Sequence, residues 1–253
     1  MVAGDYLKRI GFKGEPRADY NTLCGLQYCH FLSVPYENLD ILRGVPLSLE
    51  ICDLYKKIVT GNRGGYCFEL NACFNWLLGE LGFKTVSYFA RFLLDEPDIK
   101  RVMRRHRVMR VEADGEYYLA DVGVGSITPE RPLKLVENEQ TEIRGITYKF
   151  TKDPGLGWVL SFIRKGEWVR LYSFTEEEQS EIDFVQPNFY CQYSPDSIFN
   201  KQNMVAIRTE TGKYSLDGDV FKIFELSSGE TVEKKYTEPE IYEVLAKYFG
   251  IKL

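Results

Sequence analysis

Apolar positions follow two different periods along this chain. In the first part they recur at helical spacing, which predicts helices at 20–34, 48–62 and 67–83. The second predicted helix starts from Ser48, a residue type that often caps helices, and the third ends at Gly82. The first 83 residues are therefore expected to form a helical bundle.

From Thr85 onward, apolar and polar positions alternate with a period of two. Strands are predicted at 85–94, 106–113, 116–124, 146–151, 157–163 and 167–174, separated by Asp-Gly, Asp-Pro-Gly and Lys-Gly turns. A polar stretch with two prolines, 186–203, is followed by predicted strands at 204–210, 213–218 and 220–227 and a helix at 238–251. The pattern predicts an α+β protein with three regions: a helical bundle (1–83), a β-barrel (84–192) and a small α/β region (193–253).

Length and charge limit the class of protein. A chain of 253 residues corresponds to between one and two ordinary domains of about 150 residues. The net charge of −5 argues against a general nucleic-acid binder, which would usually be basic. The first residues contain no apolar run of signal-peptide length, and no segment approaches the roughly 18 apolar residues of a membrane helix. We therefore expect a soluble, cytoplasmic protein that does not act on a membrane.

Cysteines and histidines are few. Six cysteines are too sparse for a disulfide scaffold and are expected to be thiols. None has the spacing of a zinc site, so no metal is expected. The only two histidines are His30 and His106, so a mechanism that needs an imidazole has two candidates. His30 has no acid placed to orient it and is expected to be structural.

Cys67 lies at the start of a predicted helix, shortly after two glycines, in the segment NRGGYCFELN that begins at Asn62. Unpaired N–H groups and the positive end of the helix dipole meet at such a position and can lower a thiol pKa. Gly64 and Gly65 would let backbone N–H groups approach the sulfur, as an oxyanion hole requires. Cys67 is therefore a candidate nucleophile. Alternatively, Gly-Gly only enters a helix and Cys67 is a small core residue.

A predicted hairpin brings a histidine and an aspartate together. Asp114-Gly115 between two alternating runs is a strong hairpin signal and pairs Ala113 with Glu116. In this register Asp121 is a diagonal neighbour of His106 on one face, within reach of a carboxylate–imidazole hydrogen bond. Gly123, opposite His106, would leave room for the ring. We interpret His106 as a general base oriented by Asp121. The alternative is an ordinary strand histidine in a basic run.

These segments resemble a known family. The sequence RGGYCFELN is similar to the active-site motif of the arylamine N-acetyltransferases. VPYENL, from Val34 to Leu39, resembles the family's PFENL segment, with Tyr36 where phenylalanine is usual. HRVMRVEADGEYYLADVGVGS and the stretch from Pro187 to Phe199 also match, in the same order along nearly the whole chain.

The resemblance implies a helical bundle, a β-barrel and an α/β lid with a papain-like triad of Cys67, His106 and Asp121. It implies an acetyl-CoA-dependent arylamine or arylhydrazine N-acetyltransferase that works by a ping-pong route through an acetyl-cysteine thioester. The substrates would be coenzyme A and a small arylamine or arylhydrazine. The carboxyl-terminal segment that contributes to the site in some relatives extends beyond Leu253, so no residue of this chain is assigned to its contacts.

The resemblance also assigns substrate contacts. Residues expected around the acceptor amine are Tyr36, Phe92 and Val124, and those expected to contact coenzyme A are Met103, Arg105, Gly125 and Ser126. The basic run KRVMRRHRVMR has two interpretations. In one, Arg105, Arg107 and Met109 point away from His106 on a solvated strand face. In the other, the loop before His106 meets the phosphates or pantetheine of coenzyme A.

Two other classes of function use the same residues. The first is a transglutaminase-like or hydrolytic cysteine enzyme. Papain-like proteases place histidine roughly 130–150 residues after cysteine, whereas His106 follows Cys67 far more closely. This spacing disfavours papain itself but leaves a transglutaminase-like order open. The second class is a binding module that keeps the fold as a ligand pocket, against which an intact triad argues.

Overall fold

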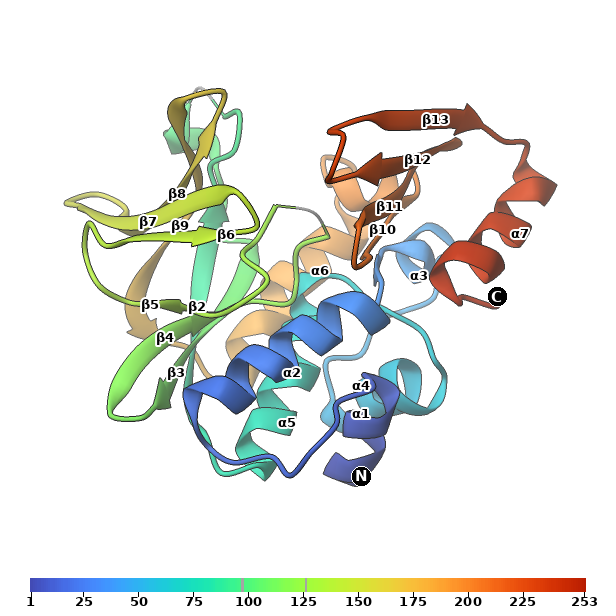
Figure 1. Cartoon of the computed structure of the whole chain (residues 1–253). Helices are drawn as coiled ribbons and strands as arrows, with labels where there is room; N and C mark the ends of the chain where they lie inside the picture. Colours follow the sequence, from blue (N-terminus) through green and yellow to red (C-terminus); the bar gives the residue numbers. More distant parts are fainter. Residues whose placement is uncertain (97, 126) are drawn as a thin grey trace.

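The computed structural model describes residues 1–253 apart from 97 and 126. It contains the α-helices α1 (Ala3–Arg9), α2 (Tyr20–Ser33), α3 (Leu39–Leu42), α4 (Ile51–Tyr55), α5 (Cys67–Glu80), α6 (Val185–Tyr193) and α7 (Glu238–Phe249). Figure 1 shows the amino-terminal helices below a barrel-like sheet on the left and a smaller sheet with α7 on the right. The α+β class expected from the sequence is confirmed.

The larger sheet has the strand order β5-β4-β3-β2-β9-β8-β7-β6. Its strands are β2 (Lys84–Phe92), β3 (His106–Ala113), β4 (Glu116–Ala120), β5 (Leu133–Lys134), β6 (Gln140–Ile143), β7 (Ile146–Asp153), β8 (Gly157–Arg164) and β9 (Glu167–Glu178). The Asp-Gly hairpin has the predicted register, with Ala113 opposite Glu116 and Met109 opposite Ala120. Pairing stops at Ala120, so Asp121 leaves the ladder just where it approaches β3.

The smaller sheet joins a short strand near the amino-terminal helices to the carboxyl-terminal region of the chain. Its strands, in the order β1-β10-β11-β12-β13, are β1 (Tyr36–Glu37), β10 (Met204–Arg208), β11 (Gly212–Asp217), β12 (Val220–Glu225) and β13 (Thr231–Lys235). β1 pairs with β10, so Tyr36 lies opposite Ala206. α7 lies beside this sheet (Figure 1). Its Val244, Leu245 and Phe249 are buried in one core with Val205, Leu216 and Phe221 of the sheet. The carboxyl-terminal sheet is thereby anchored to the segment that precedes Cys67.

Two of the segments that differ from the sequence-based prediction are explained by their local sequence. The helix predicted from Ser48 begins at Ile51, because the Ser48 hydroxyl accepts a bond from the Glu50 N–H outside the helix. It continues as a π-helical turn, Lys56–Thr60. Within the polar stretch 186–203, to which no element was assigned, α6 is a regular helix. Its proline, Pro187, lies in the first turn, where a missing N–H is tolerated.

Gly64 is required by a close approach of two backbones. A Cβ atom at Gly64 would lie 1.8 Å from the carbonyl oxygen of Pro35. The next residue, Gly65, forms a parallel bridge with Tyr36, and its carbonyl accepts the Glu37 N–H at 2.9 Å. The glycine pair therefore lets the loop before Cys67 pack against β1.

Among the described residues, no helix combines the length and the apolar character needed to cross a membrane.

We predict that Gly64→Ala lowers the free energy of unfolding by about 1–3 kcal/mol or more, because the methyl group collides with backbone that cannot move aside. Gly79→Ala is the matched control. Gly79 is exposed within α5 and has no atom near an added Cβ, so alanine should stabilise the helix by about 0.5–1 kcal/mol. Urea unfolding measures both changes. Equal stability of the two variants would contradict the assigned role of Gly64.

Candidate active site

Cys67 is the first residue of α5 and is buried. Its thiol donates to the carbonyl oxygen of Arg105 at a sulfur–oxygen distance of 3.7 Å. The backbone N–H of Phe68 also faces the sulfur and lowers the pKa of the thiol. The sequence placed Cys67 in the first helical turn, and the structure has it there.

His106 and Asp121 are in direct contact. The Nε2 atom of His106 lies 2.8 Å from Oδ2 of Asp121, and both side chains are almost fully buried. The other ring nitrogen, Nδ1, is buried and has no hydrogen-bond partner among the residues that the structure describes. Since Asp121 engages Nε2, Nδ1 is the nitrogen left to exchange a proton with a group in the cavity that His106 shares with Cys67.

Asn71 connects the helix of Cys67 to this aspartate. It follows Cys67 by one helical turn, and its Nδ2 donates to Oδ1 of Asp121 at 2.9 Å and to the carbonyl of Arg107 at 2.6 Å. Its Oδ1 accepts the Val122 N–H at 2.9 Å. Sequence reasoning did not assign a role to Asn71. The available signal was a buried amide four residues after Cys67, on the same helix face.

Gly123 has a different role from the expected one. It does not leave room for the imidazole of His106. A Cβ atom there would lie 2.5 Å from Nδ2 of Asn71 and 2.8 Å from Cα of Cys67. Its N–H donates to Oδ1 of Asp121 at 2.8 Å. The missing side chain therefore lets the segment after Asp121 pack against the start of α5.

The expected role of Gly65 also changes. Its N–H points to the carbonyl of Pro35 at 3.4 Å, so it is not directed at the sulfur. The donor beside the sulfur is the Phe68 N–H, which belongs to the helix itself.

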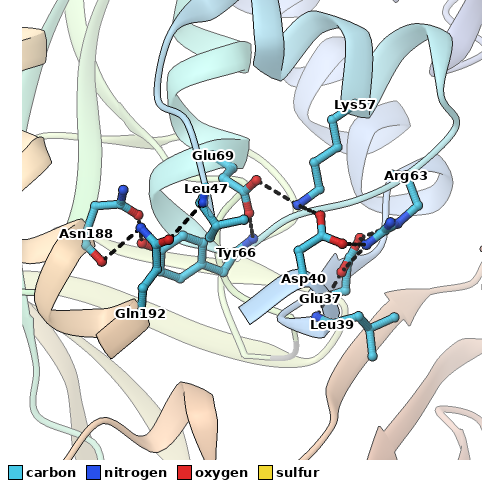
Figure 2. A network of polar contacts seen from close by, with 10 residues as sticks. All are labelled: Glu37, Leu39, Asp40, Leu47, Lys57, Arg63, Tyr66, Glu69, Asn188 and Gln192. Atoms are coloured by element: carbon cyan, nitrogen blue, oxygen red, sulfur yellow. Dashed lines mark hydrogen bonds and ion pairs between the residues drawn. The ribbon is translucent and has the colours of Figure 1, made fainter. Parts of the chain in front are cut away.

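A network of charges, with its carboxylates buried and its cations partly exposed, holds the loop that precedes Cys67 (Figure 2). Lys57 lies between Glu69, at 2.7 Å, and Asp40, at 2.8 Å. Arg63 joins Asp40 to Glu37, with nitrogen–oxygen distances of 2.9 and 2.8 Å. Oε2 of Glu69 also accepts the backbone N–H of the residue before Cys67 at 3.1 Å. The network thus fixes the first turn of α5 to β1 and α3.

Burial opposes ionisation of Cys67. It raises the pKa of the thiol well above its ordinary value, and the neighbouring Cys191 and Asp121 raise it further. The Phe68 N–H and the Arg105 guanidinium act in the opposite direction and lower the pKa. The N–H groups at the helix start lower this pKa less than desolvation of the thiolate raises it. A thiolate here needs a partner that takes its proton and stays as a cation.

The site opens into a cavity of about 310 Å³ between the helices, the barrel-like sheet and the smaller sheet. Its lining residues are Tyr36, Cys67, Phe92, Arg105, His106, Gly123, Val124, Gly125, Ile198, Phe199, Met204, Val205, Ala206, Lys213, Ser215 and Asp217. The three residues expected around the acceptor are all among them, as are Arg105 and Gly125. Met103 is 43% exposed and is not part of the lining. Ser126 lies outside the described residues.

The basic run before and within β3 is not a solvated strand face. Arg107 and Met109 are both fully buried. The Arg107 guanidinium donates to both oxygens of Glu181, at 2.5 and 2.6 Å, and lies over the Phe184 ring. Arg105 lines the same cavity as His106 and so does not point away from it. Two of the three side chains are therefore buried in the interior, and the third faces the site.

His30, the second histidine, is a core residue and does not line the cavity of the site. It is fully buried, its Nδ1 lies 3.1 Å from the hydroxyl of Tyr6, and burial lowers its pKa to about 3. It is a neutral core residue, as expected. Among the described residues, no group of three or more histidine, cysteine or acidic side chains is arranged to hold a metal.

Comparison with known proteins identifies the family. A family model described as N-acetyltransferase matches residues 19–253. The arylamine N-acetyltransferase of Mycolicibacterium smegmatis is 34% identical, over 100% of this chain and 93% of the relative. That of Escherichia coli is 33% identical, over 99% and 89%. The chain belongs to the arylamine N-acetyltransferase family.

Solved structures of the family have the same fold. The M. smegmatis enzyme superposes with a TM-score of 0.93 at 33% identity, covering 100% of this chain and 93% of that one. A structure of Mycobacterium marinum arylamine N-acetyltransferase in complex with CoA superposes with a TM-score of 0.91 at 29% identity, covering 99% and 93%. The family fold expected from the sequence is therefore confirmed.

We predict that Asp121→Asn leaves the protein folded and moves alkylation of Cys67 by iodoacetamide to higher pH, by about one unit or more. The amide cannot stabilise a charged imidazole, so the thiol loses its proton less readily. Asp121 also repels the thiolate directly and raises the pKa of the thiol by this route. If direct repulsion dominated, alkylation would move to lower pH, which would contradict the assigned role of Asp121. Measuring the alkylation rate of both proteins against pH distinguishes the two.

Proposed function

We propose that this protein is an acetyl-CoA-dependent arylamine N-acetyltransferase that forms an acetyl-cysteine intermediate on Cys67. The observation that carries the proposal is the 2.8 Å contact of His106 with Asp121 in the cavity that Cys67 lines. Membership of the family supports the reaction class. The relatives and solved structures compared above all carry arylamine N-acetyltransferase in their names.

The first half-reaction transfers acetyl to the enzyme. Nδ1 of His106 takes the thiol proton, and the imidazolium that results is stabilised by Asp121. The Cys67 thiolate attacks the thioester carbonyl of acetyl-CoA, and the oxyanion is stabilised by the Phe68 N–H at the start of α5. The carbon–sulfur bond to coenzyme A then breaks, and the leaving thiolate takes the proton from His106. One thioester replaces another.

The second half-reaction transfers acetyl to the acceptor. An arylamine or arylhydrazine nitrogen attacks the acetyl-cysteine, and His106 accepts the proton that this nitrogen loses. The thioester breaks, the proton returns to the Cys67 sulfur, and the product is an amide or a hydrazide. Because an amide is more stable than a thioester, this step favours completion.

Substrate contacts follow from the cavity lining. Tyr36, Phe92 and Val124 supply the apolar and aromatic surface that an aryl ring needs, and the Phe92 ring lies 4.9 Å from that of His106. We assign Arg105 and Gly125 to the acyl donor, since both lie in the cavity. Met103 and Ser126 remain predicted donor contacts on the resemblance alone.

The transglutaminase-like or hydrolytic alternative is not favoured, because the relatives are named as acetyltransferases. We also propose a cytoplasmic location, which is supported by six cysteines that are all free thiols. The net charge of −5 argues against nucleic acid as a partner and so supports small-molecule partners.

Acetylation of the protein in the absence of an amine tests the proposal. A covalent intermediate should accumulate when no acceptor is present. After mixing with acetyl-CoA and rapid quenching, intact-protein mass spectrometry should show one added acetyl group, mapped to the peptide with Cys67. An arylhydrazine should discharge it and yield the acetylated hydrazide.

Two variants serve as controls. Cys67→Ser should fold and show no rapid adduct, and Cys73→Ser, which alters a buried cysteine of the same helix, should behave like the parent. Absence of an adduct with acetyl-CoA, together with ready acylation by a peptide glutamine or peptide ester, would favour the hydrolytic class. Absence of an adduct with any acyl donor would leave a binding module.

The acceptor assignment makes a separate prediction. Val124→Phe narrows the cavity that Tyr36 and Phe92 also line, so the ratio of rates for small and bulky arylamines should change about tenfold or more. Acetylation of Cys67 by acetyl-CoA should change much less. Steady-state kinetics with a series of ring-substituted anilines measures the ratio. An equal response of small and bulky amines would show that Val124 does not border the acceptor.

A further inference from the structure

Strand β11 presents a row of polar side chains to the cavity. Lys213, Ser215 and Asp217 line the cavity, whereas Leu216 between them is buried in the core under α7. Alternate residues of a strand share a face, so the row runs for about 13 Å, at about 3.3 Å a residue. It carries a cation at one end, a hydroxyl in the middle and a carboxylate at the other end. None of these three side chains belongs to the proposed catalytic residues or to the proposed acceptor contacts.

The cation end of the row continues into a second cavity. Lys213 also lines a space of about 190 Å³ whose charged lining residues are Glu130, Arg144, Arg208 and Lys213. Glu130 pairs with both arginines, at 2.7 Å to Arg144 and 2.9 Å to Arg208. The two arginines thus share one carboxylate, and Lys213 adds a third positive charge to the lining, so this end of the row has a surplus of positive charge.

The ammonium of Lys213 lies in a setting that favours an anion. It lies across the β10–β11 pair from Arg208, a like charge. Among the ion pairs of the described residues, none involves Lys213. Burial and the charges of Arg208 and Lys222 lower its pKa, whereas the Asp217 carboxylate at the other end of the row raises it. A bound anion would offset both effects, since it would replace lost hydration and screen the two cations from each other.

We propose that β11 orients the acyl donor, with the phosphate groups of acetyl-CoA at Lys213 and the pantetheine arm along Ser215. The Asp217 carboxylate repels phosphate from the other end of the row. The inference rests on the proposed function and deepens it. Arg105, whose carbonyl accepts the Cys67 thiol, belongs to the reacting end of the cavity, whereas Lys213 borders the second space. The polarity of the row therefore sets the direction in which the donor lies.

Donors with and without phosphate test the assignment. Lys213→Met should raise the KM for acetyl-CoA about tenfold, because a charge-assisted contact to phosphate is lost. The KM for S-acetylpantetheine and for 4-nitrophenyl acetate, which carry no phosphate, should change less than twofold. Lys213→Arg should restore most of the loss. Added salt should raise the KM for acetyl-CoA more steeply in the parent than in Lys213→Met.

Lys222→Met is the matched control, since Lys222 lies on the neighbouring strand, pairs with Glu233 and lines neither cavity. It should retain the parent's preference for acetyl-CoA. An unchanged KM for acetyl-CoA in Lys213→Met would overturn the proposal. So would an equal rise for the phosphate-free donors, or a rise confined to an acidic acceptor such as 4-aminobenzoate. Failure of the proposed function would look different, because the parent itself would then not be acylated by acetyl-CoA.

Discussion

The hydrogen bond between Nε2 of His106 and Oδ2 of Asp121 is the contact on which the rest of the site depends. It is made at the point where β4 ends, so the aspartate is free of the ladder and can turn toward β3. Asn71 and the Gly123 N–H hold its other oxygen. Because Asn71 is on the helix that Cys67 begins, one buried amide fixes Cys67, His106 and Asp121 relative to one another.

Burial makes this geometry chemically necessary. Taken alone, the Cys67 environment raises the thiol pKa, since the sulfur is removed from water. In the proposed mechanism, a thiolate therefore forms as one half of an ion pair with His106, whose charge Asp121 balances. The charge network beside the site supports this chemistry by fixing the position of the helix start. Lys57 and Glu69 hold the first turn of α5 (Figure 2). This turn carries the Phe68 N–H that faces the sulfur.

Local signals in the sequence predicted much of this arrangement. The Asp114-Gly115 turn set the hairpin register correctly, and the glycine-preceded start of α5 was visible in the pattern. Long-range packing decided the remainder. Pro187 made the segment of α6 look like a loop in the sequence. The role of Gly64 depends on Pro35, which is distant in the sequence. The partners of Arg63 and Lys57 lie on separate elements. Nothing near Lys213 in the sequence indicates that it borders two cavities. Such contacts are properties of the folded chain, and a pattern of period two or 3.6 does not encode them.

The central claim is that the proton of Cys67 is held by His106, and the charge state of the two imidazoles tests it directly. The chain has two histidines, and His30 is an internal reference, because burial keeps it neutral. Nitrogen-15 NMR of labelled protein near neutral pH should show one neutral ring, His30, and one ring protonated at both nitrogens, His106. In Cys67→Ala the His106 ring should lose this charge at a lower pH than in the parent, because the thiolate is gone and Asp121 is the anion that stays beside the ring. A neutral His106 in the parent protein, with the same spectrum in Cys67→Ala, would contradict the account.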